Sequence, residues 1–153
     1  MENQITIYTD GSYDPKKERG GWAAILFIHD EKISLQGKVD YSTHNRMEIT
    51  AVLEALEYIR KKNLKPEKVW VYTDSQYITH LPERKEKLIN HAFKTKKGEN
   101  IRNSDLLRAL FSFLDLWDIR LIKVKAHQKK TAEENYNREV DKLSRKIVRK
   151  GLG

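Results

Sequence analysis

The sequence predicts an α/β fold in which one five-stranded mixed sheet, with three antiparallel strands and then two parallel ones, is flanked by helices. Three observations support this class. Apolar residues alternate with polar ones in three consecutive short segments, a longer segment of helical period follows, and strands then alternate with helices. No internal repeat or low-complexity linker divides the chain.

The first three strands are expected over residues 4–10, 22–29 and 32–39, where apolar residues alternate with polar neighbours. The loop at residues 15–19 and the turn at residues 30–31 are short. Parallel neighbours need a long crossover, so these strands should form an antiparallel meander.

The hydrophobic period then changes from that of a strand to that of a helix over residues 45–62. Thr43 or Asn45 is available to cap this helix. Pro66 marks a break before the fourth strand, which is expected over residues 69–73.

The second half of the chain is predicted to be mainly helical. Pro82 is expected to separate two short helices, and a clearer amphipathic helix follows them. Helices are expected at 76–81, 83–93, 103–117 and about 133–150, and the fifth strand at 119–125.

Length and composition suit one domain over residues 1–153, without a separate hybrid-binding module. The net charge of +8 favours an anionic partner, with nucleic acid as the leading candidate and a merely soluble basic surface as the alternative. The chain has no cysteine, which excludes disulfides and thiolate metal sites. No secretory signal or membrane-spanning run is visible, so a cytoplasmic location is the default expectation.

Two segments, ITIYTDGSY and VWVYTDSQY, each end a strand pattern on Tyr-Thr-Asp and thereby place Asp10 and Asp74 at the carboxyl ends of two strands. Such ends are where α/β sheets hold their ligands, although a single Asp there is more often a turn or cap residue. Glu48 is expected in the first turn of a helix, where a single acid is explained by compensation of the helix dipole. Asp141 is expected in the last helix, where a single acid is explained as part of a solvated face.

The chain resembles ribonuclease H of type 1. The matching segments occur in the family's order over nearly the whole chain: YTDGS, GGW-A-I, NRME followed by A-LEAL, YTDSQY, NSDL, V-K-AH and N---D-L. Each segment alone is a weak signal, but seven in order make a chance match very improbable.

The resemblance implies that Asp10, Glu48, Asp74 and Asp141 form a carboxylate cluster that holds two Mg²⁺ ions, with Mn²⁺ as an alternative. Such a pair of ions, about 4 Å apart, can stabilise the attacking and leaving oxygens of a phosphodiester. His127 matches the family's loop histidine, which assists proton transfer or product release. The implied reaction cuts the RNA strand of an RNA/DNA hybrid and leaves 5′-phosphate and 3′-hydroxyl ends.

The resemblance also implies contacts to the hybrid. Asn45 and Gln76 match groove contacts, while Thr43 and Asn103 match a pocket for a phosphate of the DNA strand, with helix capping as an equally good explanation of the latter two. Three departures from the family pattern bear on substrate affinity and spare the carboxylates: Lys16, Tyr41 and His44.

Residues 83–102 correspond to the family's basic protrusion, with seven basic residues against three acidic ones. Lys94, Lys96 and Lys97 are its candidate phosphate contacts, and a solvated charge run is the alternative. The last helix carries a further group of cations, which nucleic-acid binding, solubility and the helix dipole explain equally well: Lys142, Arg145, Lys146, Arg149 and Lys150.

The function predicted from the sequence is therefore a metal-dependent endonuclease that acts on RNA/DNA hybrids. The alternatives are a non-catalytic nucleic-acid-binding module on the same fold, the ribonuclease H domain of a reverse transcriptase polyprotein, and a nuclease that acts on DNA. The starting Met1 and the short tail favour a free-standing enzyme, which is expected to be a monomer.

Overall fold

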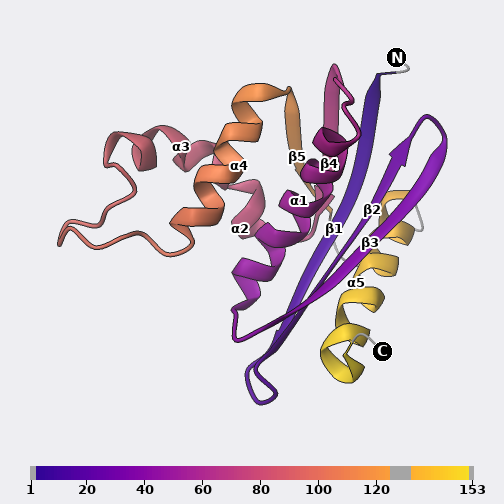
Figure 1. Cartoon of the computed structure of the whole chain (residues 1–153), viewed down its shortest axis with the longest axis horizontal. Coiled ribbons are helices and arrows are strands. Elements are labelled where there is room, and N and C mark those ends of the chain that lie inside the picture. Colours follow the sequence, from indigo (N-terminus) through magenta and orange to yellow (C-terminus); the bar gives the residue numbers. More distant parts are fainter. Residues whose placement is uncertain (1–2, 125–131, 152–153) are drawn as a thin grey trace.

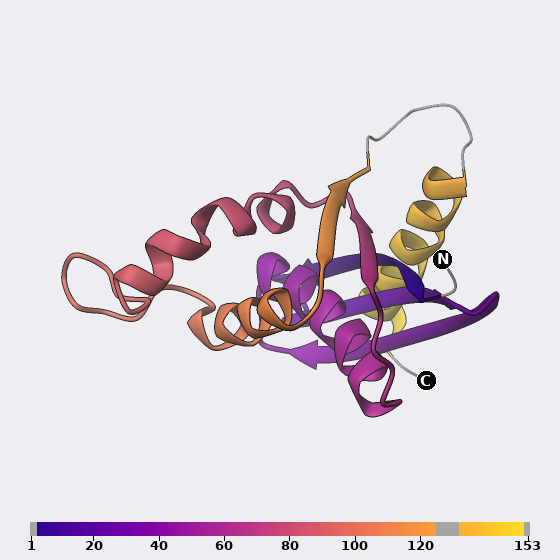
Figure 2. The ribbon, with the colours of Figure 1, turned by 90° about the horizontal axis from the view of Figure 1, so that it is seen from above.

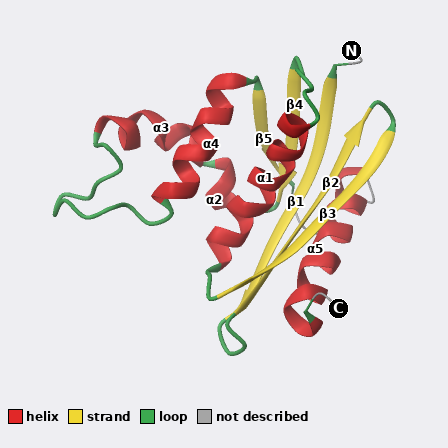
Figure 3. Ribbon diagram, viewed as in Figure 1, coloured by secondary structure: helices red, strands yellow, loops and turns green. Residues whose placement is uncertain are grey.

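The computed structural model describes residues 3–124 and 132–151 of the chain. The helices and strands are coloured by type in Figure 3. Along the chain they are β1 (Gln4–Asp14), β2 (Arg19–Ile28), β3 (Glu31–Asp40), α1 (His44–Lys61), β4 (Lys68–Thr73), α2 (Gln76–Thr79), α3 (Leu81–Asn90), α4 (Ser104–Leu116), β5 (Ile119–Lys123) and α5 (Ala132–Lys150).

The five strands form one mixed sheet in the order β3-β2-β1-β4-β5. The β1–β2 and β2–β3 pairs are antiparallel, and the β1–β4 and β4–β5 pairs are parallel. The predicted fold class, three antiparallel strands followed by two parallel ones, is confirmed.

The strand β1 is longer than predicted, because it stays paired with β2 as far as Asp14, which lies opposite Arg19. Its parallel ladder with β4 ends earlier, at the pair Tyr8 and Tyr72. Asp10 therefore lies within β1 and not at its carboxyl end as predicted, whereas Asp74 does follow the last residue of β4 directly. Beyond Tyr8 the edge of β1 that faces β4 is no longer paired with it, and the candidate site forms there.

Helices cover both faces of the sheet, with α1 and α4 on one face and α5 on the other (Figures 1 and 2). Two adjacent glycines of β2 point to these opposite faces. A Cβ on Gly20 would lie 2.5 Å from the Met47 sulfur of α1, and one on Gly21 would lie 2.5 Å from the Ser144 carbonyl oxygen of α5. Both helices therefore approach the sheet closely because these positions carry no side chain.

The larger core lies between the sheet and the face covered by α1 and α4. On the α5 face the packing is largely aromatic: Tyr8 stacks on Tyr72 with ring centroids 5.2 Å apart, and Tyr136 of α5 contacts both Tyr8 and Phe27. Offset and tilted aromatic pairs of this kind add to the free energy of burial. These ring contacts fix the position of α5 on β1 and β2.

The boundary between the two short helices differs from the prediction. Pro82 does not stop a helix but lies in the first turn of α3, where an absent N–H breaks no intrahelical hydrogen bond. The helix α3 ends at Asn90, and the positive φ angles of Ala92 and Phe93 turn the chain into the loop that projects beyond α3 in Figure 1. In the described residues, no helix is both long and apolar enough to span a bilayer.

Candidate active site

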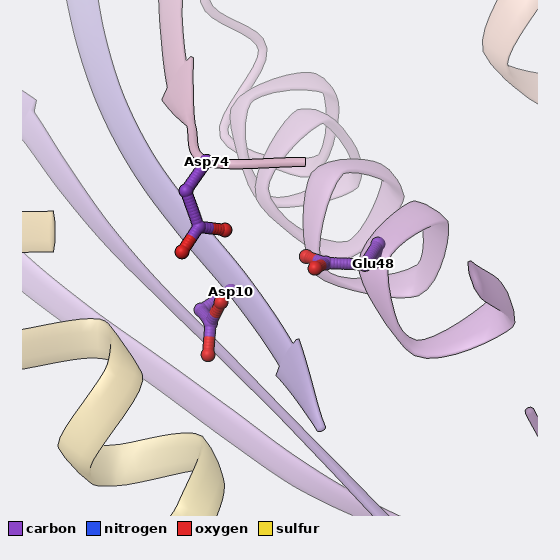
Figure 4. Close-up of side chains that lie close together, drawn as sticks. All are labelled: Asp10, Glu48 and Asp74. Carbon is purple, nitrogen blue, oxygen red and sulfur yellow. The ribbon is translucent and has the colours of Figure 1, made fainter. Parts of the chain in front are cut away.

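Three carboxylates meet where β1 and β4 diverge. Asp10 comes from β1, Asp74 follows β4, and Glu48 lies in α1; one oxygen of each lies within 4.8 Å of an oxygen of both others. Figure 4 shows the three side chains directed towards a common space. Asp10 and Glu48 are buried and Asp74 is exposed, so this space opens to solvent on the Asp74 side.

Gly11 allows Glu48 to reach this space. A Cβ at Gly11 would lie 2.4 Å from the Glu48 nitrogen and 2.4 Å from the Met47 carbonyl carbon, so the first turns of α1 rest directly on β1. Thr43 fixes the start of α1 by accepting a hydrogen bond from the Arg46 backbone N–H at 3.1 Å. Thus the capping explanation offered for Thr43 is confirmed.

Asp141 approaches the same site from α5. It lines a pocket of about 410 Å³ together with Asp10, Glu48 and Asp74. Its negative charge contributes to raising the pKa of Asp10 and of Asp74. The Asp141 carboxylate accepts a hydrogen bond from Arg145 Nε at 2.9 Å, one turn further along α5. The structure therefore brings all four predicted carboxylates to one pocket, with Asp141 outside the tight group of three.

Ser144 is a site residue that the sequence reasoning missed. Its hydroxyl is fully buried and donates a hydrogen bond to Asp10 Oδ2 at 2.5 Å. The hydroxyl of Ser12 lies 3.0 Å from the same Ser144 oxygen. Asp10 and Ser144 are 134 positions apart, so no local pattern could have revealed the contact.

The site disfavours negative charge in the absence of a cation. Burial, followed by the nearby charge of Glu48, raises the pKa of Asp10 from 3.8 to about 9, against the opposing effect of the Ser144 hydrogen bond. Burial is also the main cause that raises the pKa of Glu48 and of Asp74. A positive charge among these groups would favour their ionised forms.

The donor set suits hard divalent cations, which prefer oxygen ligands. One oxygen of Glu48, Oε1, is buried and has no hydrogen-bond partner among the described residues. An unpartnered buried carboxylate oxygen carries a cost that a bound cation would remove. Asp10, Glu48, Asp74 and Asp141 therefore fit the predicted metal ions.

His44, identified from the sequence only as a departure, stands beside this cluster. Its Nε2 lies 3.2 Å from Glu48 Oε2, and the hydrogen bond to Glu48 raises the pKa of His44. The imidazole is largely exposed, at 63%. A protonated His44 thus supplies a cation at the rim of the site.

The candidate substrate contacts fall into two groups. Asn45 and Gln76 line the carboxylate pocket. Asn103 is the N-cap residue of α4, as the capping explanation predicted, with φ of +64°, but its side chain makes no capping hydrogen bond. Its side chain accepts from Arg46 Nη1 at 3.3 Å and donates to the Tyr77 hydroxyl at 3.2 Å.

The basic protrusion (residues 83–102) extends away from the sheet in Figure 1. Lys94 donates to Asn100 Oδ1 at 2.6 Å within the protrusion, while Lys96 and Lys97 are exposed. Lys85 pairs with Asp115 of α4 and so joins α3 to α4. His127 lies outside the described residues.

Nearly the whole chain is similar to known proteins. A family model described as RNase H matches residues 2–149. A protein named ribonuclease H from Caldicellulosiruptor saccharolyticus is 34% identical over 148 residues, which are 95% of this chain and 97% of that protein. Another protein of that name, from Chlorobium luteolum, is 32% identical over 152 residues, 98% of this chain and 99% of that protein.

Solved structures share the fold at lower sequence identity. LC9-RNase H1, described as a type 1 RNase H with the type 2 active-site motif, has a TM-score of 0.79 at 20% identity. The match covers 98% of this chain and 74% of the LC9-RNase H1 chain. A foamy viral protease-reverse transcriptase in complex with an RNA/DNA hybrid has a TM-score of 0.76 at 19% identity; the match covers 96% of this chain but only 20% of the viral one.

Proposed function

Because the chain belongs to the ribonuclease H family, we propose that it is an endonuclease that hydrolyses the RNA strand of RNA/DNA hybrids with the help of two divalent metal ions. The observation that carries the proposal is the meeting of Asp10, Glu48 and Asp74 within 4.8 Å, with Asp141 lining the same pocket. Four clustered acids repel one another and a nucleic acid alike, so a protein that only bound nucleic acid would gain nothing from them.

Mg²⁺ is the proposed ion, and Mn²⁺ would be held by the same oxygens. Asp10 would serve both ions, Glu48 and Asp74 one of them, and Asp141 the other. Such a pair of ions stabilises charge on the attacking and leaving oxygens and activates a water molecule. The products would carry 5′-phosphate and 3′-hydroxyl ends.

The protein's own groups would orient the substrate. Asn45 and Gln76 line the carboxylate pocket, and their amides can hydrogen-bond the 2′-hydroxyls and base edges that a near-A-form hybrid displays in its minor groove. His127 is proposed to assist proton transfer or product release. A monomeric cytoplasmic enzyme remains the prediction from the sequence.

The test uses end-labelled RNA/DNA, RNA/RNA, DNA/DNA and single-stranded RNA, each with Mg²⁺, Mn²⁺ or EDTA. We expect cleavage of the RNA strand in the hybrid alone, and only with a divalent ion. The ends are checked by treating the products with a 5′-phosphate-dependent exonuclease. Equal cleavage in EDTA, or equal cutting of DNA/DNA, would refute the proposal.

A matched pair of variants on α1 links this activity to the site. Glu48→Gln should remove nearly all activity, since it takes a charged ligand from the cluster. Glu54→Gln removes the same charge from the same helix at an exposed position and should cleave like the wild type. Equal rates for the two variants would show that Glu48 has no catalytic role.

A further inference from the structure

A second pocket adjoins the carboxylate pocket. It has a volume of about 600 Å³ and lies between the end of β1, the start of α1 and the second half of α5. The two pockets share four lining residues, and so they form one continuous groove: Ser12, His44, Asp141 and Arg145. A strand with a phosphate at the carboxylates can continue into this second pocket.

The wall that α5 gives to this pocket is basic. Lys142, Arg145 and Arg149 follow one another at spacings of three and four, which places them on one face of the helix, and all three line the pocket. Arg145 is already bound to Asp141. Lys142 and Arg149 form no ion pair with any described side chain, so their charges are available to a ligand.

The helix dipole favours Arg149, which lies in the last turn of α5, but it does not account for Lys142. Its influence is confined to about the last turn of a helix, and Lys142 lies two turns before the end of α5. The carbonyls at that end already have donors from the hairpin between β1 and β2. Lys17 Nζ donates to the Arg149 oxygen at 3.2 Å, and Arg19 Nη1 donates to the Val148 oxygen at 3.2 Å.

We propose that this basic groove binds phosphates of the cleaved strand next to the scissile one, through Lys142 and Arg149. The proposal rests on the proposed function, since it assumes a phosphodiester at the carboxylates. Seven residues of helix separate the two cations by about 10 Å, a length over which one strand of a duplex presents about three phosphates. The groove thus supplies attraction beside a cluster of acids that repels a polyanion.

The test compares two double variants of α5 that each remove two positive charges. The groove variant, Lys142→Ala/Arg149→Ala, removes the two cations of the groove that form no ion pair with a described side chain. The control variant, Lys146→Ala/Lys150→Ala, removes two exposed cations that line neither pocket. Both are made in an Asp10→Asn background, in which the hybrid stays intact, and hybrid affinity is measured over a range of salt concentrations.

The groove variant should bind the hybrid at least about tenfold more weakly, and its log–log salt slope should fall by about two units, one for each phosphate that is no longer bound. The control variant should bind several-fold tighter than the groove variant and keep the parental slope. Equal slopes in the two double variants would refute the proposal. Lys142→Ala alone should lower the slope by about one unit. Because Lys142 lies in the middle of α5, this variant separates the loss of a phosphate contact from any effect that the Arg149 substitution has on the end of the helix.

The strand assignment is tested with neutral methylphosphonate linkages placed beside the scissile position. In the RNA strand they should weaken binding by the parent protein and have little further effect on the groove variant, because that variant already lacks the cations that bind there. In the DNA strand they should affect both proteins equally. The opposite pattern would overturn the assignment to the cleaved strand.

Wild-type protein is assayed for hybrid cleavage in parallel. Failure of the wild type to cleave would refute the proposed function. Cleavage by the wild type together with equal salt slopes for the two double variants would refute only the groove.

Discussion

The Ser144 hydroxyl donates a hydrogen bond of 2.5 Å to Asp10 Oδ2 and so joins α5 to β1 at the centre of the site. Both side chains are buried, at 0% and 3% exposure, so water does not compete for this bond. Asp141 lies one turn before Ser144 on the same helix. One hydroxyl therefore orients the Asp10 carboxylate and sets its position relative to Asp141.

Ser144→Ala should raise the metal concentration needed for half-maximal activity by about tenfold, because groups that orient metal ligands typically contribute that much to affinity. Isothermal titration of the substrate-free protein with Mn²⁺ measures the same change directly. Ser112→Ala removes a helical hydroxyl from α4, where it donates to the Arg108 carbonyl at 3.1 Å, and should leave metal binding unchanged. A loss of stability in Ser144→Ala without a change in metal affinity would make the serine merely structural.

Asp10→Asn and Asp74→Asn should each nearly abolish cleavage while the protein stays folded. Without metal, Asp10→Asn should be more stable than the wild type by at least about 1 kcal/mol at neutral pH, since folding of the wild type requires Asp10 to take up a proton and the asparagine removes this cost. Urea unfolding in EDTA measures this difference. An unfolded Asp10→Asn or Asp74→Asn protein would show that the residue is structural.

The stability difference between wild type and Asp10→Asn should depend on pH. The pKa of Asp10 is about 9 in the native state against 3.8 ordinarily, so between these values the native state binds more protons than the unfolded state. The contribution of Asp10 to stability therefore falls as pH rises through this window. The advantage of Asp10→Asn should grow with pH from 3.8 to about 9, and a constant difference would contradict the raised pKa.

Gly11→Ala should separate α1 from β1. The new Cβ would meet backbone atoms of Met47 and Glu48 at 2.4 Å, and backbone cannot move aside as a flexible side chain can. We expect a loss of about 2–3 kcal/mol of stability and a metal affinity well below that of the wild type. Gly98→Ala is the matched control for metal affinity: nothing lies within 4 Å of its Cβ, although its positive φ adds some local strain. Normal metal binding by a folded Gly11→Ala protein would contradict this account.

Replacing Lys94, Lys96 and Lys97 together with alanine should weaken hybrid binding and lower the log–log salt slope by about one unit for each phosphate that these lysines neutralise. The rate at saturating hybrid should change little, because the basic protrusion extends away from the sheet (Figure 1), and the carboxylates lie beside β1 and β4 of that sheet. Lys61, Lys62 and Lys65 at the far end of α1 provide a control with the same charge change. A slope like that of this control would remove the protrusion from the binding surface.

His127→Ala should slow turnover without eliminating it, since activation of water by a metal ion does not strictly require an imidazole. Hybrid affinity should barely change. Rates of single turnover and of steady-state turnover, measured over a range of pH, separate proton transfer from product release. Activity as low as that of Asp10→Asn, or equal to the wild type at neutral pH, would show that the assigned role is wrong.

Hydrophobic period predicted the order of the elements, and strand-end motifs predicted Asp10 and Asp74, because both are local patterns. Glu48 and Asp141 were predicted as site residues from the resemblance to ribonuclease H of type 1. The extension of β1 beyond Asp10 was not visible, since it depends on pairing with β2 across the hairpin. The sequence did not show that Pro82 lies in the first turn of α3, because a proline can follow the end of one helix or begin the next. Ser144 and the basic groove arise only when α5 packs on β1, which brings together distant parts of the chain.

The order of the elements along the chain has a consequence for the assembly of the site during synthesis. All five strands precede α5, together with Asp10, Glu48 and Asp74. A nascent chain that has been translated only as far as residue 131 therefore carries three of the four carboxylates and lacks both Asp141 and Ser144. The fourth carboxylate and the hydroxyl that holds Asp10 join the site only when α5 has been made and has packed on β1, so nuclease activity is expected only after that step.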